Sequence, residues 1–369
     1  MPRRPSCIHA AAFHRAAVAL AGAIVTAAAI AQGAAAQSVE SFYKGKSIDL
    51  IIGFTQGGGY DVYARVVARH MERHIPGTPK IVPKQMTGAG SRKAAGYVFN
   101  VAAQDGTTMA TADQSLPLQQ ALEEPGLQFD AVKLLWIGNV NADINTLATW
   151  HTHGIKSIEQ CKTQEVVLGA TGPNTSAQYP QVMNNLIGTQ FKIISGYPGG
   201  ADINLAMERG EVAGRGSNAW ASWKSTKADW LKEGKIDILV QIGLEKAPDL
   251  PNVPLLMDLA KNDEDRAVLR LLSAPTAVGR PLFSTPNVPM ERVTALRRAF
   301  DATMQDKAFL AEAEKAQLDL NPVAGEKLQE IVNEIVAAPK PVARRLAEAL
   351  IIRDVVRDLQ KESGKPAAN

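Results

Sequence analysis

Glycine-rich turns carry the residues of this chain whose types and spacing best suit binding chemistry. Residues 53–61 read GFTQGGGYD, after an apolar run at 48–52 that is typical of a buried strand. In residues 62–75, apolar side chains recur at helical spacing. A turn between a strand and a helix lets backbone approach a ligand and aims free N–H groups at it. The stretch therefore predicts a binding site that favours a negatively charged group.

Nucleotide-binding motifs do not fit this turn. The chain has neither G-x-G-x-x-G nor G-x-x-x-x-G-K-[ST] here, because Val62 stands where the third glycine after Gly57 and Gly59 is needed. A phosphate cradle or a dinucleotide site is therefore poorly supported.

Two pairs of histidines raise the question of a metal site. His70 and His74 lie one helical turn apart, but Glu72 is not where H-E-x-x-H requires a glutamate. The pair lies off the apolar stripe, so a solvated helix face is the favoured interpretation. His151 and His153 flank a predicted loop, and two ligands do not make a metal site.

Nucleophilic catalysis has little support. No G-x-S-x-G elbow occurs, and Cys161 sits in a polar stretch without a histidine nearby in sequence. We expect a protein that is not an enzyme and that needs no metal and no cofactor. An enzyme whose catalytic groups come from distant segments stays the alternative.

Three turns share one pattern, with small residues at or just before a predicted helix: residues 57–61, 87–91 and 171–176. Helix starts carry unpaired N–H donors and the positive end of the helix dipole. Three of them facing one cleft would bind a small molecule that bears a carboxylate.

The elements that must position these turns alternate between strand-like and helix-like stretches. This alternation predicts an α/β fold with parallel strands. It restarts near 141–165 and changes character near 273–289, which predicts two lobes with a ligand cleft between them. We expect residues 37–141 plus 275–369 in lobe 1, where the C-terminal helices pack back, and residues 142–274 in lobe 2.

Residues 1–36 have the features of an export signal peptide. Arg3, Arg4 and Arg15 form a basic region before the apolar stretch 16–30, and small residues 34–36 fit cleavage near Ala36. Removing these three arginines from the 40 Lys and Arg leaves 37, which equals the 37 Asp and Glu. The balance argues against a nucleic-acid partner. With one cysteine left after cleavage, no internal disulfide can form.

The ordered set of motifs resembles the Bug-type extracytoplasmic solute receptors of tripartite tricarboxylate transporters. The resemblance covers nearly all of residues 42–340. It rests on Phe54, Gly58, Gly59, Asp61, Ala64 and Arg65, then Gly88-Ala89-Gly90, Asp105-Gly106-Thr107, residues 169–176, Tyr197, Gly199, Gly210-Glu211-Val212 and residues 250–254.

This resemblance implies a two-lobed periplasmic-binding-protein fold, type II-like, that closes on an organic acid by hinge motion. It implies a periplasmic monomer that delivers a di- or tricarboxylate or an aromatic acid to membrane transporter subunits. A sensor subunit that presents its ligand-bound form stays a further alternative. The candidate ligand-binding residues are Phe54, Gly57, Gly58, Gly59, Tyr60, Asp61, Gly88, Ala89, Gly90, Ser91, Thr171, Asn174, Thr175, Ser176 and Arg215.

Three of the side chains near these turns have two interpretations. Arg215 lies between glycines and either pairs with a second ligand carboxylate or is solvated or paired internally. Asp61 either caps its helix, which is slightly favoured, or binds a cationic ligand group. Trp220 lies either in a core, which is favoured because aromatic residues most often fill cores, or in the wall of the cleft. Thr87 stands where relatives commonly have proline before Gly-Ala-Gly.

Overall fold

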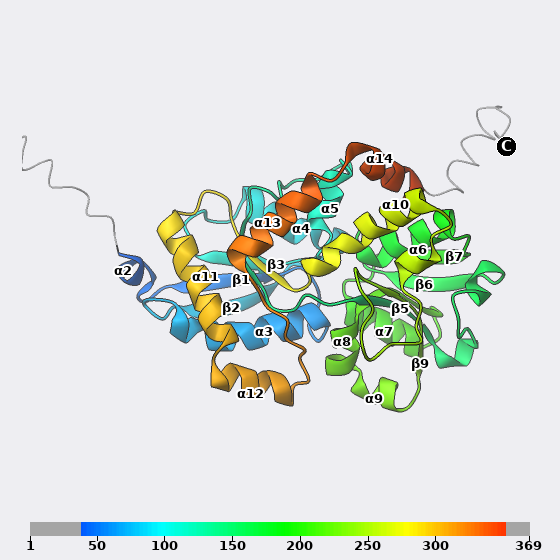
Figure 1. Ribbon diagram of the computed structural model, residues 1–369. Coiled ribbons are helices and arrows are strands. Elements are labelled where there is room, and N and C mark those ends of the chain that lie inside the picture. Colours follow the sequence, from blue (N-terminus) through cyan, green and yellow to red (C-terminus); the bar gives the residue numbers. More distant parts are fainter. Residues whose placement is uncertain (1–37, 352–369) are drawn as a thin grey trace, which may run out of the picture.

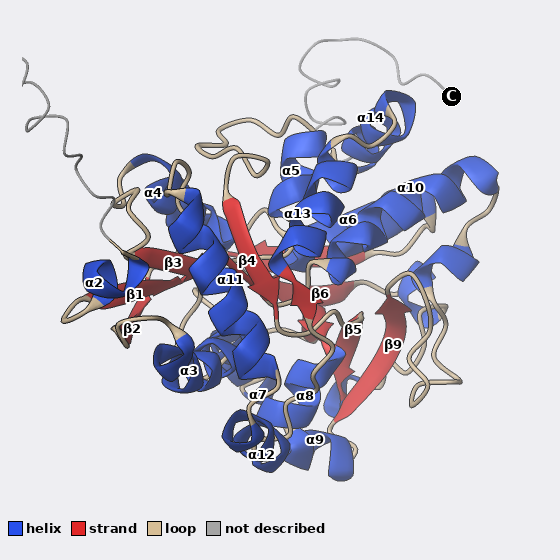
Figure 2. Cartoon of the chain, turned by 60° about the vertical axis from the view of Figure 1, so that its left-hand side comes forward, coloured by secondary structure: helices blue, strands red, loops and turns tan. Residues whose placement is uncertain are grey.

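A computed structural model describes residues 38–351 as two α/β lobes, each built around its own sheet (Figure 1). The predicted signal peptide lies outside the described residues. The α/β, two-lobed prediction is confirmed. Figure 2 shows the strands in the interior with helices on the outside of both sheets.

The first sheet has the strand order β11-β4-β10-β3-β1-β2. Strand β1 pairs in parallel with β2 and β3, whereas β10 runs antiparallel to β3 and β4, and β11 runs antiparallel to β4. The strands are β1 (Ser47–Ile52), β2 (Lys80–Gln85), β3 (Thr108–Thr111), β4 (Leu135–Asn139), β10 (Pro281–Ser284) and β11 (Val323–Ala324).

The second sheet has the order β7-β6-β8-β5-β9, with β6 parallel to β7 and β8, and β5 antiparallel to β8 and β9. The predicted parallel strands are therefore present in both sheets, but each sheet also has antiparallel pairs, because β5 and β10 begin after the chain has crossed between the sheets and need no helical crossover. The strands are β5 (Asn145–Trp150), β6 (Val166–Ala170), β7 (Phe191–Ser195), β8 (Gly214–Ala219) and β9 (Ile236–Ile242).

Helices pack on the strands of both sheets (Figure 1). The helices of the first half are α2 (Val39–Tyr43), α3 (Gly59–Met71), α4 (Arg92–Asn100), α5 (Leu116–Ala121), α6 (Thr175–Leu186), α7 (Gly200–Glu208), α8 (Trp220–Thr226) and α9 (Ala228–Lys232). Those that follow are α10 (Asp263–Ser273), α11 (Met290–Met304), α12 (Lys307–Lys315), α13 (Gly325–Val336) and α14 (Lys340–Ala349).

The C-terminal helices do not all return to the first sheet. Helices α11 and α13 contact β4, and α12 contacts α3, as expected. Helix α14 instead packs on α10 and α6, beside the second sheet. Its buried face includes Leu346, and Arg345 pairs with Asp265 at 2.6 Å. The apolar face of α14 is buried there, so the last described helix belongs with the second sheet.

Apolar packing under β4 holds the first lobe together. The Phe300 ring of α11 is fully buried and lies against Gly138 of β4, where a Cβ atom would overlap the ring. Glycine at this position lets the helix approach the sheet closely.

Phe300→Ala should lower the free energy of unfolding by about 3–5 kcal/mol, because it leaves a cavity under β4. Chemical denaturation followed by circular dichroism measures this loss. Phe99→Ala, at a partly buried position on α4, is the matched control and should cost clearly less. Equal losses at the two positions would contradict this account of the core.

Candidate functional site

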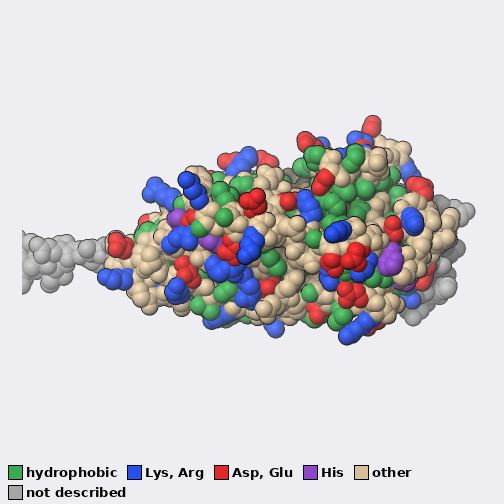
Figure 3. Space-filling view, turned by 90° about the horizontal axis from the view of Figure 1, so that it is seen from below, with side chains coloured by type: hydrophobic (Ala, Val, Ile, Leu, Met, Phe, Trp, Pro, Cys, Tyr) green, Lys and Arg blue, Asp and Glu red, His purple; other side chains and the backbone are tan. Residues whose placement is uncertain are grey.

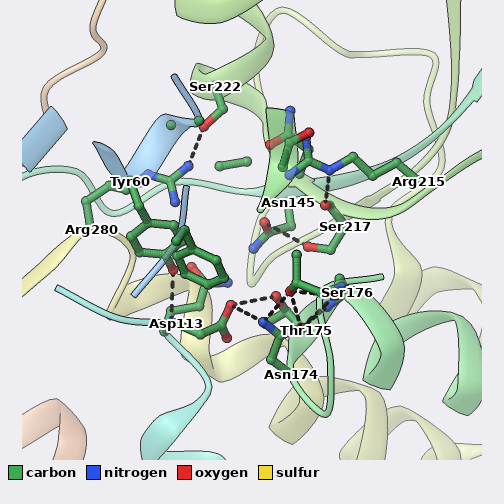
Figure 4. Close-up of a pocket in the computed structure, with 18 residues that line it drawn as sticks. Tyr60, Asp113, Asn145, Asn174, Thr175, Ser176, Arg215, Ser217, Ser222 and Arg280 are labelled. Atoms are coloured by element: carbon green, nitrogen blue, oxygen red, sulfur yellow. Dashed lines mark hydrogen bonds between the residues drawn. The ribbon is translucent and has the colours of Figure 1, made fainter. Parts of the chain in front are cut away.

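A polar cavity lies between the two lobes, where the carboxyl ends of the parallel strands meet (Figure 4). Its volume is about 50 Å³, measured for the centre of a water-sized sphere, which is room for a few waters or a short organic chain. The lining residues are Phe54, Gly58, Gly59, Tyr60, Asp113, Gln114, Asn145, Thr171, Asn174, Thr175, Ser176, Gly200, Arg215, Ser217, Asn218, Ala219, Ser222 and Arg280.

The first glycine-rich turn reaches this cavity through the start of α3. Gly58 is the N-cap of α3, and no side chain caps this end of the helix with a hydrogen bond. The first N–H groups of a helix have no partner within the helix, so this end offers donors to the cavity. Phe54 and Tyr60 line the wall with their rings stacked 4.8 Å apart.

Asp61 lies behind the wall and not in it. Its carboxylate accepts hydrogen bonds from the Gly57 N–H at 3.0 Å, Arg65 Nε at 2.7 Å and Gln85 Nε2 at 2.7 Å. It is 2% exposed. Asp61 thus fixes the turn that precedes its own helix, although it is not the N-cap, because Gly58 holds that position and no side chain caps it. Gly57 is also absent from the lining.

The second-lobe turn organises itself through its own side chains. Asn174 Oδ1 accepts hydrogen bonds from the Ser176 N–H at 3.1 Å and from Ser176 Oγ at 2.6 Å. Ser176 Oγ accepts from the Thr171 N–H at 2.9 Å. Asn174 is thus the N-cap of α6. The start of a second helix, with Thr175 beside it, therefore faces the cavity.

Asp113 joins this turn to the first lobe. It follows β3, and its Oδ2 accepts hydrogen bonds from Asn174 Nδ2 and Thr175 Oγ1, both at 3.2 Å. Its Oδ1 accepts from the Ser115 N–H at 3.0 Å and from Ser115 Oγ at 2.7 Å. Burial raises the pKa of the Asp113 carboxyl. The lobes are therefore in contact across the cavity.

Residues 88–91 do not line the cavity but support it. Gly88, Ala89, Gly90 and Ser91 all have positive φ, at 134°, 47°, 62° and 75°. Ser91 Oγ accepts a hydrogen bond from the Asp113 N–H at 2.8 Å. A Cβ on Gly172 would lie 2.6 Å from the Gly90 nitrogen. Glycine at these positions thus permits contact between the lobes, in contrast to the contact with ligand that the sequence predicts.

Two arginines line the cavity. Arg215 of β8 donates to the Ser217 carbonyl at 2.9 Å and to Asn204 Oδ1 at 3.1 Å. Arg280, 6% exposed, precedes β10, donates to Ser222 Oγ and lies 4.3 Å over the Tyr60 ring. Burial, with a smaller contribution from the charge of Arg280, lowers the pKa of Arg215 to about 9. Within residues 38–351, neither has a carboxylate within 4 Å.

Sequence reasoning missed the arginine of the first lobe and several polar neighbours. Arg280 follows Gly279 and precedes Pro281, a pattern that marks a strand start but no particular site. Asn145 and Asn218 each bury a side-chain N–H group that has no hydrogen-bond partner in the described part of the chain. Both amides line the cavity, where a ligand oxygen could accept from them.

The aromatic residues flagged in the sequence belong to the core of the second lobe. Trp220 donates to Asp249 Oδ2 at 2.7 Å and does not line the cavity. Trp223 donates to Thr146 Oγ1 at 2.9 Å, and Trp230 contacts Trp150 with ring centroids 4.6 Å apart. The core interpretation therefore holds for these tryptophans.

The pair formed by His70 of α3 and His74 of the 3₁₀ turn that follows it is not a solvated face. His70 Nε2 lies 2.5 Å from Glu312 Oε2, and His74 Nε2 lies 2.7 Å from Asp306 Oδ2. The acids belong to α12 and its N-cap, so the pair joins two helices and the solvated interpretation is wrong. In residues 38–351, no group of three or more possible ligands could hold a metal ion. Burial raises the pKa of the Cys161 thiol to about 11, which disfavours a nucleophilic thiolate.

Asp143 positions the helix that carries Ser222, the partner of Arg280. Its carboxylate accepts from the Ala221 N–H at 2.7 Å. Burial raises its pKa from 3.8 to about 6, against a lowering contribution from Arg280. The folded protein therefore binds more protons than the unfolded chain between these values, so stability falls as pH rises from about 4 to about 7.

Asp143→Asn should remove this loss of stability, which is on the order of 3 kcal/mol over the interval. Denaturant midpoints measured at a series of pH values test it. Asp229→Asn, at an exposed acid of α9, is the control and should leave the slope in place. An unchanged slope in the Asp143 variant would show that this carboxyl does not titrate as described.

Comparisons with known proteins were made for the whole chain. No protein-family profile matches it. It is 24% identical over 344 residues to the "UPF0065 protein in gbd 5'region" of Cupriavidus necator, covering 89% of this chain and 97% of that protein. None of the described helices is long and apolar enough to cross a membrane.

Solved structures of periplasmic binding proteins share the fold. The periplasmic binding protein BugD aligns with a TM-score of 0.66 at 17% identity, covering 83% of this chain and 98% of that one. R. palustris Rpa4515 with adipate aligns with a TM-score of 0.64 at 18% identity, covering 82% and 98%. MatC from Rhodopseudomonas palustris with bound malate also gives 0.64, at 18%, covering 81% and 99%. The resemblance to the Bug-type solute receptors is thus confirmed, and the chain has their two-lobed periplasmic-binding-protein fold.

Proposed function

We propose that this protein is a periplasmic receptor that captures a small organic carboxylate by hinge closure and delivers it to a tripartite tricarboxylate-type transporter. The cavity carries the proposal: two helix starts, two arginines without a carboxylate within 4 Å and two unpaired amide donors all favour a negatively charged acceptor. Two solved structures of the same fold, one with adipate and one with bound malate, support a carboxylate as the ligand.

The lining favours an aliphatic acid over an aromatic one. The aromatic rings in the wall, those of Phe54 and Tyr60, stack on each other, and Arg280 covers the Tyr60 ring. Little ring surface is left for a ligand, and the cavity is small. The predicted contacts of Phe54, Gly58, Gly59, Tyr60 and residues 171–176 with ligand remain part of this proposal.

Lobe boundaries at residues 37–141 plus 275–369 and at 142–274 belong to the same proposal. They are supported by the two sheets, since β1–β4, β10 and β11 form one and β5–β9 form the other. Closure would move the sheets about the segments between β4 and β5 and before β10. Helix α14 is the exception, because it packs beside the second sheet.

Export after cleavage near Ala36, a monomeric state, no cofactor, no nucleic-acid partner and no catalytic turnover complete the proposal. The structural neighbours are solute-binding proteins rather than enzymes. On the face in Figure 3, basic and acidic side chains are interspersed. Such a surface gives no support to binding of a polyanion.

Native mass spectrometry of freshly purified protein should show a carried organic acid. After its removal by unfolding and refolding, mono- and dicarboxylates should be screened by thermal shift, since a ligand that binds the folded state raises the melting temperature. The bound acid should be recovered unchanged after incubation. Chemical conversion of the acid would show that the protein is an enzyme and not a receptor. If no carboxylate raised the melting temperature, the proposal would be contradicted.

Gly172→Ala should weaken binding of the acid so identified by about 5–150-fold, because the new methyl group would hold the lobes apart at Gly90. Calorimetric titration measures the loss. Gly196→Ala is the matched control: its φ of 115°, like the 149° of Gly172, lies where side chains are rarely found, but no atom lies within 4 Å of the new Cβ. Unchanged affinity in Gly172→Ala would show that closure does not need this contact.

A further inference from the structure

Side chains outside the cavity also join the two lobes. Two of these contacts, Lys224 with Asp319 and Thr55 with Asp202, are made by residues that do not line the cavity. Each contact pairs a residue of one proposed lobe with a residue of the other. These contacts therefore bear on how the lobes open and close, and they do not depend on which ligand is bound.

Lys224 of α8 reaches from the second lobe to the first. Its ammonium forms an ion pair with Asp319 of the first lobe. Within its own lobe, it lies 3.4 Å from Asp249 Oδ2 and 5.6 Å from the centre of the Trp220 ring. Burial lowers the pKa of Lys224, but Asp319 and Asp249 together raise it above its ordinary value. The second lobe thus presents a charged ammonium to Asp319.

Asp319 is held on the first lobe by its backbone and its neighbours. The Tyr63 hydroxyl of α3 donates to the Asp319 carbonyl at 2.9 Å, and Leu318 is buried in the core of the first lobe. Burial, and to a smaller extent the charge of Asp319, raises the pKa of Asp143. Asp319 therefore has an acid in its neighbourhood, which makes its pairing with Lys224 more favourable. Opening of the lobes must separate the two partners.

The second contact joins the glycine-rich turn of the first lobe to α7 of the second. Thr55 Oγ1 donates to Asp202 Oδ2 at 2.7 Å. The backbones also approach closely, since a Cβ on Gly199, the N-cap of α7, would lie 2.1 Å from Thr55 Oγ1. A Cβ on Gly58, the N-cap of α3, would lie 3.9 Å from the Gly200 nitrogen. Both helix starts are positive, so the Asp202 carboxylate in the first turn of α7 also offsets their repulsion.

We propose that these two contacts, Lys224–Asp319 and Thr55–Asp202, form a latch that holds the lobes closed in the ligand-free protein. The latch rests on the hinge closure of the proposed function but not on the identity of the ligand. A contact that exists only in the closed form shifts the equilibrium towards that form. Because the closed lobes must part before a ligand enters or leaves, the latch slows both steps.

Hydrogen exchange followed by mass spectrometry tests the latch in the ligand-free protein. In Lys224→Met, Asp319→Asn and Thr55→Val, exchange at the starts of α3 and α6, which face the cavity, should be about 2–5-fold faster, because each change weakens the closed form. Combining Lys224→Met with Asp319→Asn should add little, since both changes remove the same ion pair.

Two further variants separate the latch from general effects on folding. Lys227→Met is the matched control, because Lys227 pairs with Glu208 at 3.1 Å within the second lobe. Its exchange at the starts of α3 and α6 should equal that of the unaltered protein. Lys224→Arg keeps the charge and should keep the slow exchange. In all variants, exchange in strand β6 of the second core should stay unchanged.

Stopped-flow fluorescence with malate and adipate as probes tests the effect on ligand entry and exit. In the three latch variants, association and release should both become about 2–5-fold faster, and the dissociation constant should change less than either rate. The two acids should show the same factors, since the latch residues do not line the cavity.

The outcomes distinguish the latch from the receptor function. Unchanged exchange in the three variants would overturn the latch. Faster release with unchanged association would also overturn it, because the ligand-free lobes would then be open. A change for one acid and not for the other would assign these side chains to ligand contact instead. If neither acid binds and no acid is carried, the receptor function fails, and the exchange measurement still decides the latch.

Discussion

Close contact between two backbone turns is the constraint on which the rest of the site depends. Residues 88–91 of the first lobe meet residues 171–176 of the second so closely that a Cβ on Gly172 would reach the Gly90 nitrogen. This contact lets Asp113 accept hydrogen bonds from Asn174 and Thr175. The start of α6 is thereby held against the first lobe, and the cavity is closed on that side.

Electrostatics gives the closed cavity its selectivity. The polar groups around Asp113 and Asn174 form hydrogen bonds with one another. The donors and acceptors in that part of the wall are therefore already paired. The remaining wall has unpaired donors and guanidinium groups. A buried charge without a partner is costly, so the arrangement is stable when an anion occupies it. One lobe alone would present half of this environment, which couples recognition to closure.

Local patterns in the sequence predicted much of the fold and about half of the site. The alternation of elements gave the α/β class, and the turns at 53–61 and 171–176 were placed at the cavity because strand-turn-helix signals are local. Strand direction at β5 and β10 and the packing of α14 depend on contacts far apart in sequence. For the same reason no local pattern marks Arg280, Asn145 and Asn218 as site residues. The packing role of residues 88–91 also depends on the opposite lobe, which the local sequence does not describe.

The two ends of the described part of the chain lie in different lobes, so the distance between them depends on opening and closing. Helix α2, at the beginning of the described chain, packs on α11 in the first lobe, whereas α14 lies beside α6 and α10 (Figure 1). The side chain of Asn185 donates hydrogen bonds to the carbonyls of Ala349 and Ile351 there, at 2.7 Å and 3.1 Å. Fluorophores attached at Val39 and Ile351 would therefore belong to different lobes. Energy transfer between them would follow opening and closing directly, with the buried thiol of Cys161 shielded from the labelling reagent.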